Sequence, residues 1–249
     1  MIATIRSEWI KLRTVRSNVT TAIVAMVIPL AISLLSVTFM GENSIDSGTL
    51  PGFIVGSGSV AVLLIGVIGV LCFTQEYSRG TIRLTLAATP SRPRVYLAKS
   101  VVVATTGAAL TGAIVLVGNV VGSAIIGARD VPALDSNPDA APAFLAMILM
   151  GAVVALLGMA IGALTRNPPS AITILVLWPL LVEGIVGGLL SLAFEDNIVR
   201  WMPFQTGLNS MFLELPEDGF GRWGSLGYFA AWVLLVMVLA ERSLKRRDA

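Results

Sequence analysis

The chain has 249 residues, of which 55% are apolar and 13% charged, and its formal net charge is +2. Its mean hydropathy is +0.85, and its apolar share exceeds the roughly 45–50% usual in soluble domains, which excludes an ordinary water-soluble fold. Histidine is absent and Cys72 is the only cysteine. The composition therefore excludes an intrachain disulfide, a metal site built on His or Cys clusters and catalysis by histidine.

The first segment, residues 1–18, has an amphipathic pattern. Its apolar side chains recur at helical spacing, with arginines towards the other face: Ile2, Ile5, Trp9 and Leu12 against Arg6 and Arg13. This pattern predicts an interfacial helix with Trp9 as an anchor at headgroup depth. Two roles fit it, a plain membrane anchor or a connecting helix that transmits motion from a cytosolic partner to the first span.

Six apolar segments are long enough to cross a hydrocarbon core about 30 Å thick, which takes about 20 helical residues. They are residues 19–40, 53–74, 100–127, 143–164, 170–194 and 225–240. The first lacks a clear small-residue cleavage site, so we expect it to remain as an anchor. Nothing resembles a soluble module or a long polar linker. The predicted fold is thus an all-α integral membrane protein with one domain over residues 1–249.

The distribution of basic residues predicts the orientation. Of the 17 Lys and Arg residues, four precede the first span, five lie in residues 75–99, one lies between spans four and five, and four follow residue 240. Basic residues accumulate in cytosolic loops, and ten acids lie in the opposite segments. We therefore expect both termini in the cytosol, with the terminal basic cluster at anionic lipid and no nucleic-acid partner.

The connection of residues 75–99 is the longest on the predicted cytosolic side. Residues 76–86 have a composition that suits a helical continuation of the second span, and Pro90 and Pro93 then break the chain before the third span. We expect a partner to dock here; a solvated charged loop is the alternative.

Two motifs resemble those of ABC type-2 exporter permeases. Glu76, Gly80-Thr81, Leu86, Pro90, Ser91-Arg92 and Lys99 are similar to the cytosolic loop after the second span of that family, and residues 7–13 are similar to its N-terminal segment. The resemblance implies that the loop is a coupling helix that fits a cleft on an ATPase subunit. The implied contact residues are Glu76, Arg79, Gly80, Thr81 and Arg83, with Gly80 permitting close backbone approach.

The resemblance also implies partners. No G-x-x-x-x-G-K-[ST] phosphate loop occurs, so ATP and Mg are expected on a separate ATPase subunit and no cofactor on this chain. A second permease subunit, identical or different, is implied, in a bacterial cytoplasmic membrane, with an amphipathic drug, peptide or lipid passing near the second and fifth spans. An ATP-independent transporter or channel is the alternative, although one intramembrane acid offers little for a proton relay. An intramembrane protease lacks its familiar catalytic groups.

Glu183 lies near the middle of the fifth span, where a charge costs about 2.5–3.5 kcal/mol on insertion scales. Pro179 is predicted to kink the span, with Trp178 packing at the bend. One interpretation places Glu183 and Pro179 in the pathway or its gating region. The other makes Glu183 a hydrogen-bonded structural acid inside the bundle.

Two further patterns concern packing and the loop between the last spans. Glycine pairs at four-residue spacing permit close helix contacts, by default within the subunit, with a subunit interface as the alternative: Gly118 with Gly122, Gly158 with Gly162, and Gly184 with Gly188. Residues 195–224 are too apolar for a solvated loop and too interrupted to span. They loosely resemble the family's re-entrant helices, and an ordinary interfacial loop is an equal alternative.

Overall fold

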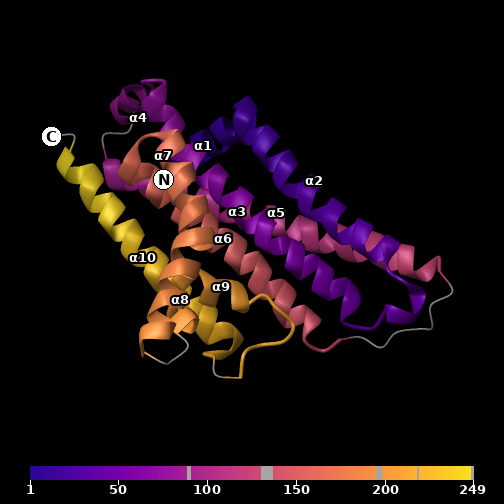
Figure 1. Cartoon of the computed structure of the whole chain (residues 1–249). Coiled ribbons are helices and arrows are strands. Elements are labelled where there is room, and N and C mark those ends of the chain that lie inside the picture. Colours follow the sequence, from indigo (N-terminus) through magenta and orange to yellow (C-terminus); the bar gives the residue numbers. More distant parts are fainter. Residues whose placement is uncertain (89–90, 130–136, 195–197, 218, 248–249) are drawn as a thin grey trace.

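The computed structural model describes residues 1–88, 91–129, 137–194, 198–217 and 219–247. Every regular element in these ranges is a helix, and Figure 1 shows them gathered into one elongated bundle. Six helical stretches are long and apolar enough to cross a membrane: Arg16–Phe39 (α2), Thr49–Ser78 (α3), Arg92–Gly127 (α5), Ala140–Thr165 (α6), Pro168–Phe194 (α7, η2 and α8) and Gly221–Leu244 within α10 (Gly221–Arg247). The predicted all-α class with six spans is confirmed.

The centre of the bundle is the pair α3 and α6. About 61% and 56% of their most apolar windows are buried, against 22–28% for the other four spans. Glycines let the two backbones touch, because a Cβ at Gly158 would overlap the carbonyl oxygen of Gly66, and one at Gly69 would overlap that of Ala155. The pair Gly158 and Gly162 therefore packs within the subunit, as predicted.

The other two glycine pairs differ from each other. A Cβ at Gly118 would contact Ile54 and one at Gly122 would overlap Leu50, so this pair also packs inside the chain. A Cβ at Gly184 or Gly188 would have no described atom within 4 Å. The default of packing within the subunit therefore does not hold for this third pair, which lies on the outside of span five, and its alternative role at a subunit interface stays a prediction.

The N-terminal helix α1 (Ile2–Thr14) is separated from α2 by Val15, whose backbone is extended with φ −78° and ψ 117°. Leu12 and Ile5 pack against the bundle beside Ile68 and Val102, whereas Trp9 stays exposed. Part of the predicted apolar face of α1 thus packs against the bundle, and the rest, including Trp9, stays exposed. The reason is Glu8, which lies on the buried face of α1 and needs partners inside the bundle.

The connection after the second span is shorter than predicted. Helix α3 ends at Ser78, so the expected continuation to Leu86 is wrong; a turn at residues 79–81 leads into a separate helix α4 (Ile82–Ala88), and α5 begins at Arg92. Gly80 has φ +68°, and a Cβ added to it would meet no described atom within 4 Å, so glycine serves the left-handed backbone there rather than a close approach. The Leu86 side chain and Pro90 lie outside the described residues.

The two ends of the bundle carry different short elements. Figure 1 shows α1, α4 and the C-terminus at one end of the bundle, which we call the α4 end. Helix α9 (Pro203–Asn209) lies towards the opposite end, which we call the α9 end. The α9 end also holds η1 (Glu42–Ser44) and η3 (Ile198–Trp201). Hydrogen bonds from the Thr49 hydroxyl and the Gly48 amide lower the pKa of Asp46, which precedes α3.

Candidate functional site, a ring of buried charges

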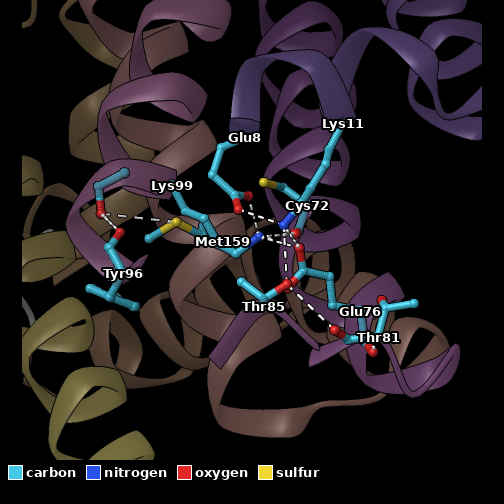
Figure 2. Close-up of polar contacts among 10 residues, drawn as sticks. Glu8, Lys11, Cys72, Glu76, Thr81, Thr85, Tyr96, Lys99 and Met159 are labelled. Carbon is cyan, nitrogen blue, oxygen red and sulfur yellow. Dashed lines mark hydrogen bonds and ion pairs between the residues drawn. The ribbon is translucent and has the colours of Figure 1, made fainter. Parts of the chain in front are cut away.

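Four charged side chains from three helices form a closed ring at the α4 end. Glu8 and Lys11 come from α1, Glu76 from the end of α3 and Lys99 from the start of α5. Lys11 Nζ lies 2.7 Å from Glu8 Oε1 and 2.9 Å from Glu76 Oε1. Lys99 Nζ lies 2.5 Å from Glu8 Oε2 and 2.8 Å from Glu76 Oε1. Acid and base therefore alternate around the ring, as Figure 2 shows.

Three of the four ring members are buried, Lys11 is 38% exposed, and the ring is electrically balanced. The side chains of Glu8 and Lys99 are 2% and 1% exposed, and that of Glu76 is 10% exposed. Each ammonium uses its three N–H groups: Lys99 also donates to the Cys72 carbonyl at 3.3 Å, and Lys11 to the Thr85 hydroxyl at 3.1 Å. Because two acids offset two bases, these charges are tolerated in a desolvated place that would be costly for any one of them alone.

Helix α4 is attached to the bundle through this ring. The Lys11 ammonium reaches Thr85 on α4, and the Thr81 hydroxyl donates to the Glu76 carbonyl at 3.5 Å. Figure 1 shows α4 standing away from the long helices. A cavity of about 340 Å³ lies between α1, α3 and α4, with Glu76 and Leu84 among its walls. Lys11 therefore links the side chain of Thr85 on α4 to the ring.

The predicted contact residues divide into two groups. Arg79, Gly80, Thr81 and Arg83 are exposed on the turn and on α4. Glu76 is buried in the ring instead, with its Oε2 atom lacking a hydrogen-bond partner among the described residues.

Sequence reasoning missed several residues of this region. The roles of Glu8 and Lys11 were not predicted, and Lys99 was noted only as part of the resemblance. For Lys99 the available signal was a charge near the end of an apolar helix, where it needs a partner. For Glu8 it was an acid on the apolar face of α1, at helical spacing from Ile5 and Leu12. Leu84, 72% exposed on α4, was also missed, because a single exposed leucine is uninformative without knowing that its helix projects.

Glu183 and Pro179 lie in a second polar site, in the middle of span five. The stretch Trp178–Val182 (η2), which contains Pro179, is a π-helical turn, and α8 (Glu183–Phe194) follows it. The buried Glu183 carboxylate accepts hydrogen bonds from the Phe204 amide at 3.0 Å, the Gln205 amide at 2.9 Å and the Trp178 indole at 3.1 Å. It thus satisfies free N–H groups at the start of α9, whose own cap residue Met202 makes no side-chain bond.

Trp178 was predicted to pack at the bend, but its side chain is largely exposed and only its indole N–H turns to Glu183. The geometry makes Glu183 a hydrogen-bonded acid that joins two segments. Its predicted part in a pathway or gate stays a prediction.

Three arginines lie outside the segments predicted to be cytosolic, and each has a local partner at the α9 end. Arg129 donates to the Val37 carbonyl at 2.8 Å and to the Met40 carbonyl at 2.6 Å, at the end of α2. Arg222 donates to the carbonyls of Ser210 at 2.8 Å and Phe212 at 2.9 Å, just after α9. Arg200 lies over the Trp201 ring. Arg129 and Arg222 thus complement the negative carbonyl ends of helical segments.

The fold and these sites define a polytopic, all-helical membrane protein, and within the described ranges no group of three or more His, Cys, Asp or Glu side chains could hold a metal ion. A model of the ABC-2 family transporter proteins matches residues 4–187. The chain belongs to this family and is a membrane component of a transporter, a class that works in general with an ABC ATPase partner. No curated protein matches the chain.

Proposed function

We propose that the chain is the transmembrane subunit of an ATP-driven exporter that receives its energy through α4 from a separate ABC ATPase subunit. The observation that carries this function is the arrangement at the α4 end. A short helix projects from the bundle with exposed Arg83 and Leu84, and it is attached by Lys11 to a ring that joins α1, α3 and α5.

The ring explains how movement of α4 reaches the spans. A shift of α4 acts on Lys11, which is bonded to both Glu8 and Glu76, and these two are bonded to Lys99. Because each member has two ring partners, moving one helix alone breaks at least two charge-assisted bonds in a buried place. The three helices therefore respond to α4 as a rigid unit, the kind of movement that changes access in transporters.

The remaining parts of the proposal follow from the family and from the distribution of charge. Both termini lie in the cytosol of a bacterial cell, with the chain in the cytoplasmic membrane, and ATP and Mg bind to the partner. A second permease subunit, identical or different, completes the pathway near the second and fifth spans. The cargo is amphipathic: a drug, a peptide or a lipid. Glu183 and Pro179 belong to the region that gates this pathway.

The test is co-purification of the tagged chain with its ABC ATPase in mild detergent. Arg83→Glu combined with Leu84→Asp changes only exposed side chains of α4, so we expect ATPase recovery to fall about tenfold or more, as for loss of central contacts in an interface, with the melting temperature of the chain unchanged. Arg94→Glu, another exposed arginine at the α4 end, is the matched control and should leave recovery unchanged. Equal recovery with the double variant, or cargo movement by the chain without an ATPase, would contradict the proposal.

A further inference from the structure

Helix α9 is held at its two ends by opposite charges from two different spans. Glu183 of α8 accepts the amides of Phe204 and Gln205 at the beginning of α9. Arg222 of α10 donates to the carbonyls of Ser210 and Phe212 just after its end. Each charge has the sign that suits the helix dipole at its position, so α9 is joined to span five by one end and to span six by the other.

The two attachments are unequal. On the side of span six, the Phe204 ring packs edge-on against Phe229 of α10 at 5.4 Å between centroids. A Cβ at Gly207 would lie 2.8 Å from the Phe229 ring and 2.9 Å from Met150 Cε, so the surfaces fit with no spare room. Ser210 and Met211 are fully buried there. This contact is apolar, close-packed and continuous with the core of the bundle.

On the side of span five, the attachment of α9 itself is polar. The Glu183 carboxylate supplies two bonds to α9, and the Gln205 side chain adds a weaker one to the Pro179 carbonyl at 3.4 Å. Span five is interrupted at the same level by the π-helical turn Trp178–Val182. Such turns are rare and cluster at functional sites, and Pro179 has no amide hydrogen with which to close the regular helix.

We infer that Glu183 is the positioning residue of a separable joint: α9 moves as one body with α10, and it parts from span five where Glu183 meets Phe204 and Gln205. At the joint itself, α9 is held to span five by few polar bonds beside a deformable turn. The segment just before α9 stays with span five, because Val199 and Met202 pack against Gly187 of α8, where a Cβ would lie 3.1 Å and 3.2 Å from them. The contact of α9 with α10 rests instead on packing that cannot be loosened gradually. When the α9 end moves, spans five and six therefore separate between α9 and span five, and α9 stays with α10.

The experiment compares two cysteine reporters, one on α9 and one directly after its end, in the full chain with Cys72→Ser. Gln205→Cys reports the side next to Pro179, and Ser210→Cys reports the fully buried side next to α10. The rate of maleimide labelling in detergent is measured for each reporter with and without Glu183→Ala. We expect labelling at position 205 to rise about tenfold, because loss of the joint raises the open population, and labelling at position 210 to change less than about twofold.

Further variants keep the result interpretable. Glu183→Gln retains a carbonyl acceptor and should give a smaller rise at position 205 alone, which covers the case in which the alanine variant does not fold. Arg222→Met should show the reverse pattern, with the larger rise at position 210. Glu217→Ala, at an exposed acid of the α9 end, should change neither rate. Equal rises at both reporters in Glu183→Gln, or no rise at position 205 in either Glu183 variant, would overturn the inference.

Discussion

At the α4 end Lys99 lies between two carboxylates from other helices, whereas at the α9 end Arg222 lies against backbone carbonyls. The first arrangement joins helices sideways, and each charge in it depends on the charge of its neighbours. The second fixes the end of a short helix, and its partners are peptide groups that no substitution can remove. A buried charge can thus serve either to couple spans or to hold a short helix in place, and the two uses respond differently to mutation.

The largest expected effect is the removal of one charge from the ring. Lys99→Met keeps the length of the side chain but leaves Glu8 and Glu76 with a net negative charge in a buried place, so the free energy of unfolding should fall by about 3–5 kcal/mol. Unfolding in mixed micelles, followed by circular dichroism, measures the change. Arg94→Met, at an exposed arginine on the same helix, is the control. A loss no larger than that of the control would show that the ring is not a coupled unit.

The second prediction removes two charges together. Glu8→Gln added to Lys99→Met restores electrical balance and leaves the bond between Lys11 and Glu76 intact. We therefore expect the double variant to recover about 2 kcal/mol relative to Lys99→Met alone, measured in the same unfolding assay. Strictly additive losses would mean that the four side chains act independently. A simple exchange of charge between positions 8 and 99 should not rescue stability, since it places like charges side by side.

A smaller effect is expected at the α9 end. Arg222→Met deprives the carbonyls of Ser210 and Phe212 of their donor, which should cost about 1–3 kcal/mol as unsatisfied buried groups. Neutralising an exposed acid five positions earlier in the chain with Glu217→Gln should recover nothing, in contrast to the ring, because the partners of Arg222 are peptide groups. The same unfolding assay decides between the two cases. If Arg222→Met combined with Glu217→Gln regained free energy of unfolding relative to Arg222→Met alone, the two ends would not differ in the way described.

Much of the local structure could be predicted from residues close together in the chain. The amphipathic start of the chain predicted α1, and Pro93 was predicted to break the chain before the third span and lies in the first turn of α5. The turn at Gly80 was not predicted, since a helical continuation and a break at a glycine are both compatible with residues 76–86. The left-handed backbone at Gly80 belongs to the turn that separates α3 from α4, and only the structure shows it.

The pairing of the four ring residues could not be predicted from the sequence. Lys11 and Glu76 are 65 positions apart, and Glu8 and Lys99 are 91 apart. Nothing local specifies such pairs, because any buried acid could be matched with any base that the fold brings near. Glu183 was singled out correctly as an acid that needs partners, but its partners are backbone amides, which every residue but proline carries and no sequence pattern marks.

The class of a six-span helical membrane protein could be predicted from the sequence alone, because the length of an apolar run and the obligatory bonding of the backbone in hydrocarbon leave few other structures. The central position of α3 and α6, and the outward faces of the other spans, are visible only in the folded chain. The spans are similarly apolar throughout, and lipid is as apolar as a protein interior, so hydropathy cannot separate a buried face from a lipid-facing one. Close packing and the pairing of a few buried charges determine which face of each span is buried.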